Sequence, residues 1–156
     1  MRVKNYGFGI PRELHDTQEW FCAIDAFDFA DPQPLTELIL SGTPIPPAYK
    51  QAIADIIAGV RKPNKKAAAK LKVPARERMH IACGLSLLLG LNDVLKRGSE
   101  RIAERKCVEP IEVIRRLEKD ASKLIKKKAD EYDISVETVE NLLRDLRKKA
   151  ENFPIV

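Results

Sequence analysis

Apolar residues recur at helical spacing along most of this 156-residue chain, and this periodicity restricts its fold more than any other feature. Trp20, Phe21, Ile24 and Phe27, for example, follow the i, i+1, i+4, i+7 pattern of one helix face. No stretch of alternating apolar and polar residues is long enough to indicate a strand. The sequence therefore predicts an all-α protein with about seven helices.

Proline and glycine residues mark where the predicted helices begin and end. The prolines of residues 31–34 end the first helix, and Gly42 ends a short second one. Pro47, Pro74 and Pro110 each suit the first turn of a following helix, where the missing amide hydrogen would be unpaired anyway. The helix after Pro47 is expected to bury four residues on one face: Ile53, Ile56, Ile57 and Val60.

The net charge of +5 is unevenly divided along the chain. Residues 1–60 contain four Lys/Arg and eight Asp/Glu, whereas residues 61–156 contain 24 and 15. Residues 61–78 alone contain eight Lys/Arg and one Glu, the sharpest change of composition in the sequence. We therefore predict a small acidic helical region over 1–60, a basic linker over 61–78 and a helical C-terminal domain over 79–156. The basic part favours a polyanionic partner, although a solvated surface fits the charge nearly as well.

The longest apolar run, residues 81–91, is too short to cross a membrane. Eleven residues rise about 16 Å as a helix, against a hydrocarbon core of about 30 Å. We therefore predict a buried core helix here and no membrane partner. The basic N-terminus has no apolar stretch behind it, and three widely spaced cysteines do not indicate a disulfide framework. These features predict a cytoplasmic protein.

The segment 122–149 contains the most informative pattern in the chain. Two steeply crossing helices need a small residue at their closest approach, and Ala129 occupies that position. Asp133 lies at the turn, where one residue must be left-handed, and Asp tolerates this conformation better than most residues. Ser135 follows as a predicted N-cap of the second helix. The apolar residues of that helix would face inward: Val139, Leu142, Leu143 and Leu146.

This spacing resembles the helix-turn-helix family, in the form A-x-x-[YF]-x-[IV]-S-x-x-T-V-x-x-[LI]-L of bacterial and phage regulators. The resemblance covers about 24 residues, and Asp133 replaces the usual glycine of the turn. It implies that the second helix reads the major groove of duplex DNA. The base-reading residues would then be Ser135, Val136, Glu137, Thr138, Asn141 and Arg144.

Basic side chains of the linker and of the C-terminal segment would then contact phosphates. Such contacts release counterions, so the logarithm of the affinity falls with log salt by about 0.9 for each phosphate neutralised. The predicted phosphate-binding residues are Arg61, Lys62, Lys65, Lys66, Lys70, Lys72, Lys126, Lys127, Lys128 and Lys148.

Two carboxylates on the outward face of the second helix, Glu137 and Glu140, oppose this interpretation. Carboxylates repel phosphates, and in the major groove their usual partner is the cytosine amino group. Pairing with Arg144 and its neighbours would neutralise them. Carboxylates that stand alone on the exposed face would weigh against DNA binding.

Residues 31–59, with the sequence DPQPLTELILSGTPIPPAYKQAIADIIAG, carry a second resemblance. They resemble the stretch PLxxLIxSGxPIPxxxxxxLAxLI of small uncharacterised proteins in proteobacterial phages and mobile elements, which often end in a helix-turn-helix. The resemblance implies a phage or mobile-element setting and says little about chemistry. Together the two resemblances imply a DNA-binding protein that acts in transcription regulation.

A protein–protein interaction module is the alternative function. A phage-encoded inhibitor of a host defence complex, similar in kind to an anti-CRISPR protein, fits the size and charge equally well. Its basic surface would bind a host protein or nucleoprotein complex. The aromatic residues Trp20, Phe21, Phe27 and Phe29 are expected in the core, but a region of 60 residues is marginal, so a homodimer through them is also possible.

An enzyme is the least favoured class. Neither histidine lies near a candidate nucleophile, and the paired carboxylates have the spacing of solvated helix faces. His80 and Cys83 have the i, i+3 spacing of two ligands, but zinc needs four ligands, or three and a water molecule. We therefore predict no catalytic residues, no metal site and no cofactor.

Overall fold

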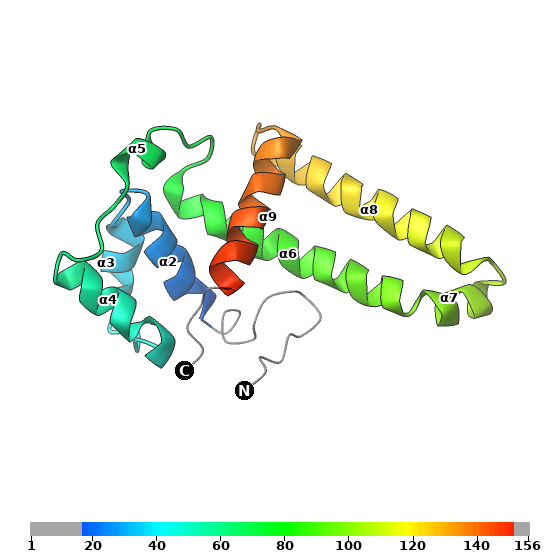
Figure 1. The fold of residues 1–156 in the computed structure, drawn as a ribbon, viewed down its shortest axis with the longest axis horizontal. Helices are drawn as coiled ribbons and strands as arrows, with labels where there is room; N and C mark the ends of the chain where they lie inside the picture. Colours follow the sequence, from blue (N-terminus) through cyan, green and yellow to red (C-terminus); the bar gives the residue numbers. More distant parts are fainter. Residues whose placement is uncertain (1–16, 152–156) are drawn as a thin grey trace.

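The computed structural model describes residues 17–151, and within this range all regular structure is helical, without strands (Figure 1). The prediction of an all-α fold with about seven helices is confirmed. The helices in chain order are α2 (Gln18–Asp28), α3 (Gln33–Leu40), the short 3-10 helix η1 (Pro47–Tyr49), α4 (Lys50–Ile57), α5 (Lys65–Ala68), α6 (Ala75–Arg97), α7 (Ser99–Lys106), α8 (Pro110–Glu131) and α9 (Val136–Glu151).

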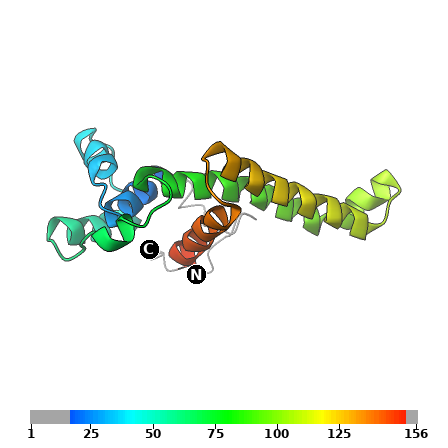
Figure 2. The ribbon, with the colours of Figure 1, turned by 90° about the horizontal axis from the view of Figure 1, so that it is seen from above.

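The helices divide into a body and a projecting hairpin. In the body, α2 packs against the first half of α6, and α3 and α4 lie beyond α2, as Figure 1 shows. The second half of α6 leaves the body beside α8, and α7 joins the two helices at the far tip. Figure 2 shows that α9 crosses the hairpin where it leaves the body and lies on one side of it.

The main core draws on both sides of the predicted linker. Trp20 and Phe21 of α2, Met79 of α6 and Leu146 of α9 belong to one cluster of buried side chains. The acidic front helices therefore share a core with the C-terminal helices. Residues 61–78 connect these parts of the chain, and Val73 within them belongs to the same core, so they do not separate two independent cores.

The end of α4 differs from the sequence prediction. Ile53 is buried and Ile56 packs against the core, whereas Ile57 and Val60 are 77% and 74% exposed. The helix ends at Ile57, and Gly59 then takes a left-handed conformation with φ of +71°. Helical spacing therefore no longer applies to Val60, and the prediction that Ile57 and Val60 are buried is wrong.

Helix α6 changes from buried to exposed along its length. Ile81, Cys83 and Leu85 are buried, so the predicted core helix over residues 81–91 is correct for its first half. It is wrong for the second half, where α8 leaves one face of α6 uncovered. By length and composition alone, α6 is the one helix among the described residues that is able to cross a membrane. The uncovered face, called the α6 stripe below, consists of Leu87, Leu88, Leu91, Val94 and Leu95, each 41–50% exposed.

Candidate nucleic-acid interface

The chain turns sharply between α8 and α9, and the local geometry follows the sequence prediction closely. Asp133 is left-handed, with φ of +51°. The backbone NH of Ile134 donates to the carbonyl oxygen of Ala129 at 3.0 Å, which closes the end of α8. The Ser135 hydroxyl accepts a hydrogen bond from the backbone NH of Thr138 at 3.1 Å and thus caps α9. The predicted two-helix corner is therefore present at residues 129–138.

A second, smaller core holds this corner together. Ala129 of α8, Val139 and Leu143 of α9, and Leu85 of α6 form one buried cluster, each 7% exposed or less. Leu142 and Leu146, which lie further around α9, belong to the main core. Because both cores include residues of α9, this helix is fixed against α6 and α8 along most of its length.

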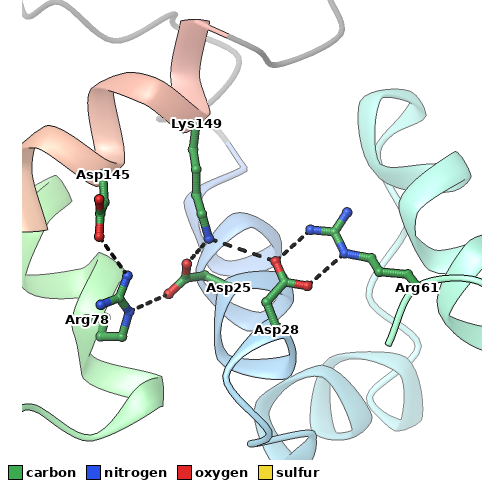
Figure 3. A network of polar contacts seen from close by, with 6 residues as sticks. All are labelled: Asp25, Asp28, Arg61, Arg78, Asp145 and Lys149. Carbon is green, nitrogen blue, oxygen red and sulfur yellow. Dashed lines mark hydrogen bonds and ion pairs between the residues drawn. The ribbon is translucent and has the colours of Figure 1, made fainter. Parts of the chain in front are cut away.

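A network of charged side chains fixes the end of α9 to the body (Figure 3). Asp25 of α2 is 2% exposed and accepts hydrogen bonds from Arg78 of α6, at 3.3 Å, and from Lys149 of α9. Arg78 also donates to Asp145 of α9 at 3.3 Å and lies over the Phe29 ring. The network therefore ties three helices, and it sets the direction in which α9 points. No sequence motif predicted it.

Among the ten predicted phosphate-binding residues, Arg61 and Lys128 bind carboxylates of the fold. Arg61 donates two hydrogen bonds to Asp28, at 2.8 and 2.6 Å, which raises the pKa of its guanidinium group. Lys128 pairs with Glu131 at 2.9 Å. In the structure the charges of Arg61 and Lys128 are therefore engaged within the fold. The other eight are exposed on the surface: Lys62, Lys65, Lys66, Lys70, Lys72, Lys126, Lys127 and Lys148.

The fold brings part of the basic linker against the predicted base-reading residues. A groove of about 350 Å³ lies between residues 70–73 and the first turns of α9. Lys70 and Lys72 line one wall of the groove. The opposite wall contains four of the six predicted base-reading residues, Ser135, Glu137, Thr138 and Asn141. Sequence reasoning placed these two sets on separate elements, and the structure makes them one surface.

The other two predicted base-reading residues, Val136 and Arg144, lie outside the groove lining and are exposed. Val136 is 41% exposed at the first position of α9. The Arg144 guanidinium donates to the amide oxygen of Asn141 at 3.0 Å. Asn141 and Arg144 thus form a pair on the outer face of α9, one turn apart.

Glu137 and Glu140 are exposed, and the ion pairs found among the described residues include neither of them. Arg144, the predicted partner, is bound to Asn141 instead. The internal neutralisation that would favour DNA binding is therefore not found. Glu137 does lie in the groove near Lys70 and Lys72, so the local charge there is mixed.

The cysteine and histidine residues form no metal cluster in the described part of the chain. Cys22 and Cys83 are buried, and a hydrogen bond between the two side chains together with burial raises the pKa of the Cys22 thiol. His80 and Cys107 are exposed. The described residues thus place a buried thiol pair in the core.

Comparisons of the chain with known protein families, with curated proteins and with solved structures found no match. The functional argument therefore depends on the residues and on the geometry of the α8–α9 corner.

Proposed function

We propose that this chain is a non-enzymatic protein that binds duplex DNA through the α8–α9 corner, as a regulator of phage or mobile-element type. The observation that carries the proposal is the groove beside α9. There, Lys70 and Lys72 lie opposite Ser135 and Asn141 although more than 60 residues separate them in the sequence. A DNA-binding protein contacts bases with a recognition helix and phosphates with flanking cations, and this groove provides both.

The side chains divide into two roles in this proposal. Lys70 and Lys72 would neutralise phosphates on one flank of α9, and Lys126 and Lys127 would do so from α8. Asn141 suits a bidentate contact with adenine, and an arginine one turn further suits guanine. Because Arg144 already donates to Asn141, this hydrogen bond would hold both side chains ready before DNA arrives.

The carboxylates restrict which sequences would be bound. Glu137 would accept a hydrogen bond from a base amino group, usually that of cytosine, and would repel a nearby phosphate. Glu140, on the outer face of α9, adds to the repulsion. We therefore expect modest affinity for random duplexes and a preference for sites with cytosine opposite the first turn of α9.

Fluorescence anisotropy of labelled duplexes, measured at several salt concentrations, tests the proposal. The wild-type chain should bind, and log affinity should fall with log salt by about 0.9 per phosphate contacted. K70E/K72E should weaken every duplex alike, whereas N141A should reduce the preference between sequences. Lys50→Glu, an exposed change on α4, is the matched control and should leave binding unchanged. Failure of the wild-type chain to bind any duplex at low salt would overturn the proposal.

The isolated carboxylates favour a second candidate, a protein–protein interaction module such as an inhibitor of a host defence complex. Exposed carboxylates beside lysines suit a protein surface of mixed charge, and the α6 stripe would suit an apolar part of the same partner. A pull-down from nuclease-treated host lysate distinguishes the two. A stoichiometric protein that binds the wild-type chain but is lost with L88K/L95K would favour this candidate.

Self-association, if it occurs, needs a different surface from the one that the sequence indicated. Trp20 and Phe21 are 3% and 5% exposed, so they offer nothing to a second copy. The α6 stripe, by contrast, leaves five large apolar side chains of the described residues half exposed on one helix face. Two copies that pair these faces about a two-fold axis would complete a four-helix arrangement with their hairpins. A homodimer of this kind is the form we propose.

A further inference from the structure

Two adjoining hollows open on the body, away from the groove beside α9. The first, of about 630 Å³, has walls from α2, α3 and α6, and the second, of about 540 Å³, has walls from α2, α6 and residues 43–46. Glu19, Thr43 and His80 line both, so the two hollows meet at these residues. Neither hollow shares a lining residue with the groove assigned to DNA.

The first hollow combines carboxylates with an apolar wall. Three carboxylates line it: Glu19, Glu37 and Glu77. Its one arginine, Arg76, donates to Asp31 at 2.9 Å, so this positive charge is already paired. Buried and half-buried apolar residues line the same hollow: Cys22, Ala23, Pro34 and Leu38. The hollow therefore suits a group with an apolar stem and a positive charge, as in an arginine or lysine side chain.

The carboxylates of this hollow are available to such a group. Glu19 is exposed and Glu77 is half-buried, and the ion pairs found among the described residues include neither of them. Glu37 accepts a hydrogen bond from the neutral amide of Gln33 at 2.8 Å, which leaves its charge in place. A guanidinium group would form charge-assisted hydrogen bonds with these oxygens, the stronger class of hydrogen bond.

The second hollow is lined by Trp20, which has an unpaired donor. The side chain is 3% exposed, and in the described part of the chain its indole NH is the one buried side-chain polar group without a hydrogen-bond partner. A buried indole NH normally donates to an acceptor. The second hollow therefore needs an acceptor, whereas the first needs a cation.

We propose that the two hollows form one binding site for a peptide segment with a cationic side chain. A carbonyl oxygen of the peptide would accept the indole NH of Trp20, and the cation would lie among the carboxylates of the first hollow. The indole nitrogen is shielded from water, so the carbonyl would reach it by a small shift of the exposed side chains between the hollows, Glu19 and His80.

A peptide fits both hollows because one residue carries both groups. Its backbone supplies the acceptor, and an arginine or lysine side chain supplies the cation a few bonds away. Pro44 and Pro46 stiffen the wall of the second hollow, because each fixes its own φ angle. Nucleic acid is disfavoured here, since the carboxylates repel phosphates. The site is thus separate from the DNA surface proposed above and does not depend on it.

NMR titration of the full ¹⁵N-labelled chain tests the site directly. The chain has one tryptophan, so its spectrum contains one indole NH signal. Acetyl-Gly-Arg-Gly-amide should move this signal saturably. The same peptide with citrulline, which has nearly the shape of arginine but no charge, should bind at least about fivefold more weakly. Methylguanidinium, which has the charge but no carbonyl group, should leave the indole signal in place.

Variants separate the two parts of the site. E19Q/E77Q should weaken the arginine peptide by about fivefold, whereas E100Q/E104Q on α7 is the charge-matched control and should leave the affinity unchanged. Trp20→Phe keeps the ring but removes the NH, and it should weaken binding as followed by the backbone amide signals of α2. E19Q/E77Q should leave the affinity for DNA within about twofold of wild type.

Three outcomes would overturn the proposal. The first is an indole signal that the arginine peptide does not move, since the NH would then have no acceptor in the ligand. The second is equal affinity for the arginine and citrulline peptides. The third is an equal loss of affinity in the two glutamine variants, which would show attraction to the net charge of the chain. Each of these results leaves the proposal for DNA standing.

Discussion

The body buries charged and apolar side chains that the hairpin leaves exposed, although α6 runs through both. In the body, the first half of α6 buries its apolar face and also Arg78, which binds Asp25 out of contact with water. In the hairpin, the second half of α6 exposes the α6 stripe, and the charges of α7 and α8 point to solvent. The body thus supplies rigidity, and the hairpin supplies surface.

This difference predicts where the molecule is sensitive to substitution. Removing one partner of a buried ion pair costs about 3–5 kcal/mol, because the other charge remains buried, whereas an exposed pair contributes about 0–1 kcal/mol. Single changes in the body should therefore alter stability. Single changes in the hairpin should alter binding and leave the fold intact.

The largest effect should come from Asp25→Ala. This change leaves Arg78, 6% exposed, and Lys149 without the carboxylate that binds both. We expect a loss of about 3–5 kcal/mol in the free energy of unfolding, measured by urea denaturation. Asp120→Ala, which removes an exposed pair with Lys123, is the control and should cost less than about 0.5 kcal/mol. Equal losses in the two variants would show that the body does not depend on its buried charges.

Tyr49 should make the stability of the body fall at high pH. Its side chain is 1% exposed, and burial raises its pKa to about 12 from an ordinary value of 10. Since the folded state favours the neutral phenol, its contribution is complete below pH 10 and is lost as the pH rises to about 12. The difference between wild type and Y49F should change by about 2 kcal/mol over this window. A constant difference would contradict burial of the phenol.

The carboxylates of α9 should lower affinity for DNA without affecting the fold. E137Q/E140Q removes two exposed negative charges, and we expect tighter binding of all duplexes by about five-fold at low salt, with a smaller gain at high salt. Glu100→Gln with Glu104→Gln, on α7 at the far tip of the hairpin, is the charge-matched control and should leave binding unchanged. Unchanged binding to a duplex with E137Q/E140Q would exclude α9 as the contacting helix.

The smallest effect on stability should come from substitutions in the α6 stripe. In L88K/L95K two half-exposed leucines become lysines, so unfolding of a single chain should change by less than about 0.5 kcal/mol. The oligomeric state, measured by light scattering, should change from dimer to monomer. A wild-type chain that is already monomeric at high concentration would rule out the proposed homodimer.

The features that the sequence predicted well are those that short segments determine. Ala129, Asp133 and Ser135 lie within seven positions, and each was assigned its role from the conformation that its neighbours require.

The features that were missed depend on segments far apart in the sequence. Asp25 lies 53 positions from Arg78 and 124 from Lys149, and its only local signal is a carboxylate within an otherwise apolar helix face. Leu88 was predicted to be buried and is exposed. Periodicity identifies an apolar helix face, but it does not tell whether another helix covers that face. Arg61 shows that the basic residues of a segment are not all available to a partner, because Asp28 of α2 binds its guanidinium group within the fold.

The continuous helix α8 has a consequence for how such a protein is able to change over evolution. Its two ends are the turn after α7 and the turn before α9, so its length sets the rotational phase between the tip of the hairpin and α9. One inserted residue would rotate the tip by about 100° relative to α9 and move it by about 1.5 Å. Seven inserted residues would nearly restore the phase, with a difference of about 20°. Changes in the length of α8 should therefore be tolerated in steps of whole turns, and intermediate lengths should turn the tip of the hairpin in a different direction from α9.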